Sequence, residues 1–120
     1  MGNYNNLEVW KISKEIAIYV YQLTSNKAFS RDFSLRDQIR RSAISVPSNL
    51  AEGDESGSQK MSVKYFFIAK ASLAELRTQF EIAKEIGYVE NPVFNELSLK
   101  MEMLARRITK LIQHRQSLIN

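Results

Sequence analysis

Few residues in this sequence have the types and spacing that catalysis or metal binding requires. The 120 residues include one histidine and no cysteine, which excludes thiolate metal sites and histidine clusters. A di-iron site in a helical protein uses Glu-x-x-His pairs, but Leu111 stands three residues before His114. The sequence contains no nucleophile-elbow, P-loop or dinucleotide-binding motif. We therefore predict that the protein is not an enzyme, that it needs no metal or cofactor, and that His114 is a solvated helix residue.

The side chains best suited to binding a partner are basic, and they fall into three groups. The candidates for contact with nucleic-acid phosphates are Arg36, Arg40 and Arg41, then Lys60 and Lys64, and then Arg106, Arg107, Lys110 and Arg115. The formal net charge of +4 favours anionic partners. Without a recognisable RNA-binding or DNA-reading motif, such binding should depend little on base sequence.

Two other interpretations account for the same basic residues. They can form solvated helix faces, and those near a helix C-terminus also interact favourably with the helix dipole. Alternatively, Arg40 or Arg41 can pair with Glu52 or Glu55 of a neighbouring copy in an oligomer. The sequence leaves these interpretations open beside phosphate binding.

Hydrophobic periodicity predicts that helices position these groups. Apolar residues recur every three or four positions, and no segment alternates with the period of a strand. The expected helices span about 7–27, 35–52, 58–86 and 92–117. Ser34 and Asn91 have the residue type of N-caps, and Gly53 and Gly87 that of C-terminal stops. Short connections between them predict an all-α, up-down-up-down antiparallel four-helix bundle that forms a single domain over residues 1–120.

Pro47 interrupts the apolar pattern of the second predicted helix. Proline removes one backbone donor, and its ring crowds the carbonyl group four residues earlier, which here belongs to Ala43. We therefore expect a kink near 43–46, which packing on both sides would stabilise.

Some apolar residues fall outside the stripes that would build the core of one bundle. They are Ile44 on the second predicted helix and Phe67, Ile68, Ile82 and Ile86 on the third. A helix that is apolar on most sides is usually buried on most sides, which favours a homo-oligomer with these residues at its interface. Scattered apolar surface residues are the competing interpretation.

No apolar run approaches the roughly 20 residues of a membrane span. The first residues lack the basic start, apolar centre and small-residue cleavage site of a secretory signal. We expect a cytoplasmic protein without membrane contact.

Three segments resemble the family of 23S rRNA-intervening sequence proteins. They are NLEVWK (6–11), RDQIRRSAISVPSNLAEG (36–53) and YFFIAKASLAELRTQFEIAKEIGYV (65–89). The central segment is similar to the family pattern Q-I-R-R-A-x-x-S-I-P-x-N-I-A-E-G. Ser42, Val46, Leu50 and Ala71 are departures that conserve volume.

The resemblance implies a bacterial-type four-helix bundle that assembles as a homopentamer. It also implies a relation to the accessory protein of diversity-generating retroelements, a basic pentameric bundle that engages nucleic acid. Within the motif, Pro47 and Gly53 are expected to shape the helix, and Asn49 to pack or bond the backbone. Glu52 is expected to accept backbone hydrogen bonds or to pair with a basic neighbour.

Together these features predict a non-enzymatic, oligomeric scaffold that binds RNA or DNA with little sequence specificity. The alternative is a protein–protein adaptor that binds no nucleic acid and whose partner docks on the oligomer.

Overall fold

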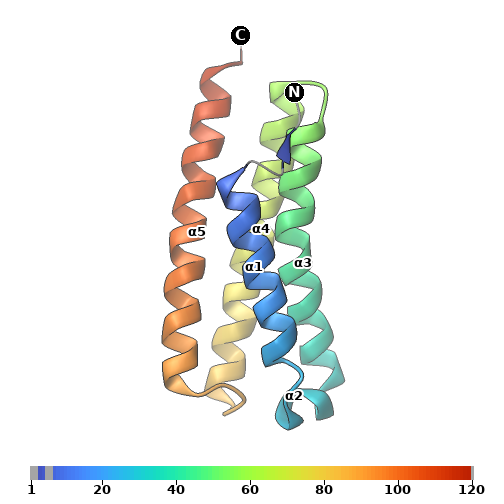
Figure 1. Ribbon diagram of the computed structural model, residues 1–120, viewed down its shortest axis with the longest axis vertical. Helices are drawn as coiled ribbons and strands as arrows, with labels where there is room; N and C mark the ends of the chain where they lie inside the picture. The colour runs from blue at the N-terminus through green and yellow to red at the C-terminus, as the bar shows by residue number, and fades with distance from the viewer. Residues whose placement is uncertain (1–2, 5–6, 120) are drawn as a thin grey trace.

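Four long helices and one short helix make up the part of the chain that the structure describes, residues 3–4 and 7–119 of this computed structural model (Figure 1). The helices are α1 (Glu8–Leu23), α2 (Lys27–Arg31), α3 (Phe33–Glu55), α4 (Gln59–Glu85) and α5 (Asn91–Ser117). No strand occurs within these described residues, and the prediction of an all-α fold is confirmed.

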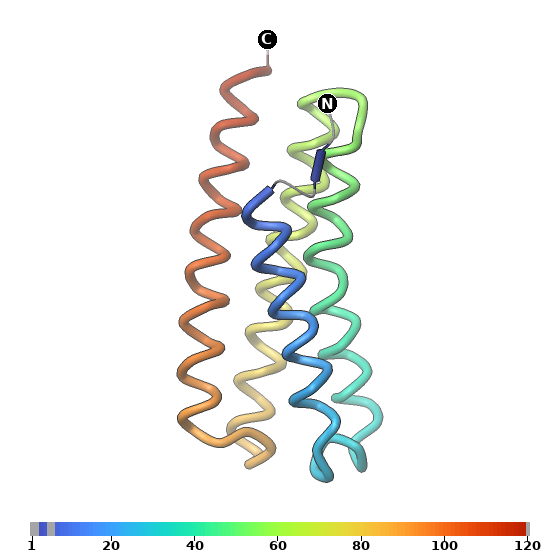
Figure 2. Tube along the Cα trace, in the orientation of Figure 1, coloured from blue at the N-terminus to red at the C-terminus, as the bar shows by residue number. Residues whose placement is uncertain are grey.

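The four long helices lie side by side along the 50 Å axis of the molecule, and consecutive long helices run in opposite directions (Figure 2). α3 packs against α1 and α4, while α5 packs against α4 and, over a smaller contact, α1. In the described part of the chain, the backbones of α1 and α4 do not approach each other closely, and neither do those of α3 and α5. Each long helix therefore packs between two neighbours and leaves one side to solvent.

The core consists of the apolar stripes that the helical spacing predicts. In α4, Phe66, Leu73 and Phe80 are at most 1% exposed. The ring of Phe80 stacks on Phe94 of α5 with centroids 5.5 Å apart. Burying each large apolar side chain contributes about 1.5–3 kcal/mol, so these stripes are what hold the helices together.

The connection after the first helix differs from the prediction, because α1 ends at Leu23 rather than near residue 27 and α2 follows it. The Thr24 hydroxyl donates to the Val20 carbonyl oxygen at 2.7 Å. Asn26 then starts α2, since its side-chain oxygen accepts a hydrogen bond from the Phe29 N–H at 3.0 Å. Phe29 is fully buried, which fixes α2 against α3.

The helix predicted at 35–52 is longer in the structure, and both predicted ends are wrong. Asp32 rather than Ser34 is the N-cap, and its carboxylate accepts from the Leu35 N–H at 3.1 Å. Gly53 does not stop the helix but lies inside it, where an added Cβ would meet the Phe66 ring at 2.7 Å. Gly53 thus allows α3 and α4 to pack closely together. The helix α3 continues through both Pro47 and Gly53.

The last two long helices lie within one residue of their predicted bounds at each end. Gly87 closes α4 as predicted, with a φ of 87° that suits glycine. The Tyr88 N–H donates to the Ala83 carbonyl at 2.9 Å and the Gly87 N–H to the Lys84 carbonyl at 3.0 Å, the two bonds of a Schellman motif. Asn91 is not the N-cap of α5, because Glu90 occupies that position.

Candidate nucleic-acid and assembly surfaces

Arg40 is committed to an internal contact that joins α3 to the end of α1. Its guanidinium donates to the Thr24 hydroxyl at 2.8 Å, to the Ser25 hydroxyl at 3.2 Å and to the Tyr21 carbonyl at 3.3 Å. It also lies over the Tyr21 ring, 4.6 Å from the centroid. These contacts satisfy groups at the C-terminal end of α1, so Arg40 has a structural role that its sequence spacing did not reveal.

Unlike Arg40, three other predicted arginines pair with carboxylates near the surface. Arg36 contacts its neighbour Asp37 at 3.1 Å and Arg106 contacts Glu102 at 2.8 Å, both near the surface. Arg107 pairs with Glu8, which joins α5 to the start of α1. Exposed pairs of this kind contribute about 0–1 kcal/mol, so phosphate can compete for the guanidinium groups of Arg106 and Arg107.

Arg115 is different, because its ion pair is buried. Its guanidinium contacts the Asp54 carboxylate at 2.7 Å, and the two side chains are only 13% and 6% exposed. It also lies over the Phe66 ring, 5.2 Å from the centroid, and donates to Gln59 at 3.5 Å. Arg115 therefore ties the end of α5 to α3 and α4 and is a poor candidate for phosphate contact.

The remaining predicted basic residues are exposed and make no ion pair within the described residues. They are Arg41, Lys60, Lys64 and Lys110. The start of α4 and the end of α5 lie at the same end of the molecule (Figure 1), as the contact between Gln59 and Arg115 also shows. Lys60, Lys64 and Lys110 thus belong to one end, whereas Arg41 lies in the first half of α3, towards the end that carries α2.

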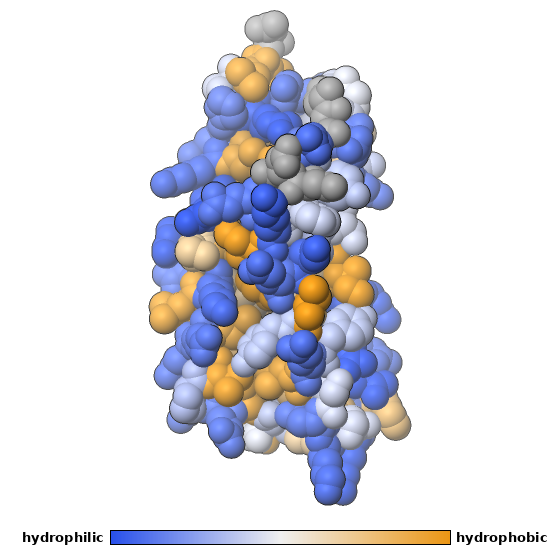
Figure 3. Space-filling view, in the orientation of Figure 1, coloured by the Kyte–Doolittle hydropathy of each residue, from blue (hydrophilic) through white to orange (hydrophobic). Residues whose placement is uncertain are grey.

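The residues predicted for an oligomer interface are all exposed in the single chain. Ile44, Phe67, Ile68, Ile82 and Ile86 have exposed fractions between 40% and 52%. On the face that carries α1, apolar surface forms separate patches between hydrophilic side chains (Figure 3). A shallow, mostly apolar groove lies between α1 and α3, and it is lined by Lys14, Ala17, Ile18, Tyr21, Gln22, Ile44 and Pro47.

The motif residues of α3 have distinct structural surroundings. The Asn49 amide donates to the Ser45 carbonyl at 2.8 Å and to the Ser45 hydroxyl at 3.0 Å, in agreement with the backbone-bonding role expected for it. The Ser45 hydroxyl lies 2.8 Å from that of Ser72, which links α3 to α4. Glu52 is exposed, and within the described residues it makes no ion pair.

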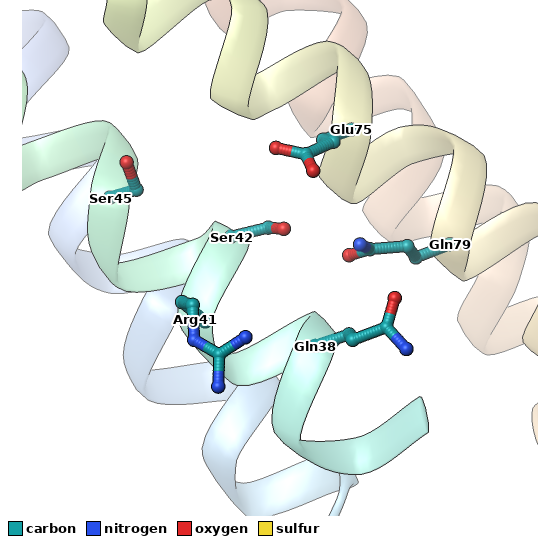
Figure 4. Close-up of a pocket in the computed structure, with 6 residues that line it drawn as sticks. All are labelled: Gln38, Arg41, Ser42, Ser45, Glu75 and Gln79. Atoms are coloured by element: carbon teal, nitrogen blue, oxygen red, sulfur yellow. The ribbon is translucent and has the colours of Figure 1, made fainter. Parts of the chain in front are cut away.

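A polar pocket of about 410 Å³ between α3 and α4 was not predicted from the sequence. Side chains from both helices line it (Figure 4), and they are Gln38, Arg41, Ser42, Ser45, Glu75 and Gln79. The Gln79 Oε1 atom is buried there without a hydrogen-bond partner among the described residues. The pocket has amide, hydroxyl and charged groups, which can form hydrogen bonds with a polar side chain or with water.

Two further residues, Asp32 and Tyr88, join the turns at the end that carries α2. The Tyr88 hydroxyl donates to the Asp32 carboxylate at 3.0 Å, and its ring packs edge-on against Phe29. The hydrogen bond to Asp32, aided by burial and the carboxylate charge, raises the pKa of Tyr88 above its usual 10.0. A tyrosine directly after a helix-closing glycine was the only sequence signal for this contact.

Neither a cluster of metal-binding side chains nor a membrane-spanning helix occurs among the described residues. They contain no group of three or more histidine, cysteine, aspartate or glutamate side chains that could hold a metal ion. None of the helices, as far as they are described, has the length and apolar character of a membrane span.

Comparison with known proteins places the chain in a family. The family of the 23S rRNA-intervening sequence protein matches residues 5–110. A solved structure of similar fold is a protein of unknown function from the S23 ribosomal protein family of Bacteroides thetaiotaomicron. It has 20% sequence identity and a TM-score of 0.80, and the match covers 87% of this chain and 97% of that one. No curated protein matches the sequence. The chain therefore belongs to the family of 23S rRNA-intervening sequence proteins.

Proposed function

We propose that the protein is a non-enzymatic scaffold, an antiparallel four-helix bundle with α3 bent near Pro47 that assembles into a homopentamer in the cytoplasm. In this proposal it binds the phosphates of RNA or DNA with little preference for base sequence. The observation that carries the proposal is the group Lys60, Lys64 and Lys110, three exposed basic side chains that share one end of the molecule.

Assembly would turn this modest charge into a stronger binding surface. A ring of identical subunits repeats the three lysines around one face. Binding at several sites then raises the overall affinity without any new contact in a single subunit. Arg106 and Arg107 lie on the same half of α5 and can add to this surface, because their carboxylate partners are on exposed side chains.

The test combines a mass measurement with a binding titration. Light scattering should show about five times the 13.9 kDa of one chain. Titration with single-stranded and duplex RNA and DNA at two salt concentrations should show binding that weakens steeply with salt, since each phosphate contact releases a counterion. Failure to bind at low salt, or binding that salt does not change, would exclude phosphate contact.

The second candidate is a protein–protein adaptor. Arg36, Arg40 and Arg115 are engaged within the chain, which reduces the basic surface that nucleic acid could use. Purification of the tagged protein from its own cells distinguishes the two functions. Nucleic acid that remains bound at low salt and is released by nuclease supports the scaffold, and a stoichiometric second protein with no nucleic acid supports the adaptor.

A further inference from the structure

Two of the exposed apolar surfaces in the described part of the chain lie on different helices. One is the α1–α3 groove described above, lined by Ile18, Tyr21, Ile44 and Pro47. The other is the outer face of α4, where Ile68 and Ile82 are 40% and 48% exposed, and we call it the α4 ridge. In the described residues α4 packs on α3 and α5, and α1 packs on α3 and α5, so α3 lies between the helix that carries the ridge and α1.

The α4 ridge has the sequence pattern of a helix that packs on two sides. Its exposed positions Ile68, Ala71, Glu75, Thr78, Ile82 and Glu85 follow a three-four spacing. That is the spacing with which a helix places side chains into the holes of a neighbouring helical surface. The buried stripe of α4, through Phe66, Leu73 and Phe80, repeats the same spacing on the opposite side and builds the core. The outer stripe has no such partner within the described chain.

The charges around the two surfaces are complementary. In the second half of α4 the exposed charged residues are all acidic, namely Glu75, Glu81 and Glu85. The basic side chains of that half, Arg77 and Lys84, are partly buried, and Lys84 lies over the Phe94 ring of α5. At the groove the charged lining residue is Lys14. Arg40, which makes no ion pair within the described residues, lies over the ring of the groove residue Tyr21. An acidic ridge beside a basic groove favours their contact.

From these observations we infer that the α1–α3 groove of one copy receives the α4 ridge of a second copy. The contact is head-to-tail, because each copy offers a groove to one neighbour and a ridge to the other. Contacts of this kind close into rings or continue as filaments, whereas a contact between identical surfaces stops at a dimer. The inference rests on the proposed homo-oligomer and specifies which surfaces build it.

Two variants test the two surfaces separately. Ile44→Arg places a charge in the groove and leaves the ridge intact, and Ile82→Arg does the reverse. Both positions are about half exposed, so the folded subunit should tolerate the change, which circular dichroism and thermal melting would verify. Leu99→Arg on α5 is the matched control, since Leu99 is 67% exposed and lies outside both surfaces.

A mixing experiment gives a result that only a head-to-tail contact produces. Each variant alone should have the mass of a single chain, 13.9 kDa, while the Leu99→Arg control keeps the mass of the parent oligomer. An equal mixture of the two variants should form a dimer of twice 13.9 kDa and nothing larger, because one intact ridge meets one intact groove. Reversing the groove charge with Lys14→Glu should weaken assembly most at low salt.

The outcomes separate this inference from the proposed function. A parent protein that is monomeric overturns both the homo-oligomer and the pairing of groove with ridge. A parent oligomer whose mass survives Ile44→Arg or Ile82→Arg overturns the pairing alone and leaves the scaffold intact. Variants that are both monomeric but fail to form a mixed dimer exclude the pairing of groove with ridge.

Discussion

The guanidinium of Arg115 lies 2.7 Å from the carboxylate of Asp54, and this buried pair joins the end of α5 to the end of α3 across 61 residues of sequence. Both partners belong to the end of the molecule where α3 turns into α4. A buried charge destabilises the fold when its oppositely charged partner is removed, because water does not solvate it well there.

Removal of Arg115 should therefore destabilise the fold. We expect Arg115→Ala to lower the free energy of unfolding by about 3 kcal/mol or more, since Asp54 is left buried without a counter-charge. Denaturation by urea measures the change. Arg106→Ala is the matched control, because its exposed pair with Glu102 contributes about 0–1 kcal/mol. If Arg106→Ala lowers the free energy of unfolding as much as Arg115→Ala does, the buried ion pair is no more important for stability than the exposed one.

Gly53 should resist substitution by the best helix former. In Gly53→Ala the new Cβ meets two atoms of the Phe66 ring at 2.7 and 2.9 Å and the Ser62 carbonyl at 3.1 Å. Overpacking of this kind costs about 1–3 kcal/mol, which outweighs the gain of about 1 kcal/mol in helix propensity. Gly57→Ala is the control, because a Cβ there meets nothing within 4 Å. If the Gly53→Ala variant has a higher melting temperature than the parent protein, the close approach of α3 and α4 at Gly53 does not contribute to stability.

Alkaline pH should weaken the end of the molecule that carries Tyr88. The pKa of Tyr88 is higher in the folded chain than in the unfolded one, because the phenol donates to Asp32. Its contribution to stability is therefore complete below the unfolded value of about 10 and is lost as the pH rises through the folded value.

The measurement for Tyr88 is the melting temperature of the parent and of Tyr88→Phe between neutral and alkaline pH. Tyr88→Phe keeps the ring against Phe29 but removes the titrating group. Above pH 10 the melting temperature of the parent should fall more than that of the variant. An equal fall in both proteins would contradict the role of the Asp32 contact.

Binding of RNA should depend on the exposed lysines and not on the internal arginines. Lys60→Gln, Lys64→Gln and Lys110→Gln should each reduce the dependence of binding on salt by roughly one phosphate contact in every subunit. Arg36→Gln is the control, because Arg36 is partly buried beside Asp37 and the Phe33 ring. If Arg36→Gln weakens RNA binding as much as the lysine variants do, the binding surface lies at the end of the molecule that carries α2.

Local sequence patterns predicted the helices well and their long-range contacts poorly. The four-three spacing of α4 and the Gly87 stop depend on neighbours in sequence, so both were predicted correctly. Gly53 was misread because glycine inside a helix and glycine after a helix look the same in sequence, and only the Phe66 ring from α4 distinguishes them.

The basic residues show the same limit. Arg40 and Arg41 are adjacent and of one type, yet Arg40 bonds the end of α1 while Arg41 is exposed beside the polar pocket. Asp54, the partner of Arg115, has no distinctive sequence pattern, because a single acidic residue near a helix end is common. Which charges become buried depends on how α1 and α5 pack on the others, and local periodicity does not contain that information.

Because the first helix is short, fewer helices pack together at one end of the molecule than at the other. α1 has 16 residues and spans about 24 Å, whereas α4 and α5 have 27 each and span about 40 Å. Towards the α3–α4 turn, α1 no longer accompanies the other three long helices (Figure 1), and there the Asp54–Arg115 pair lies. Backbone amides after Arg115 should therefore exchange with solvent before those around Phe80.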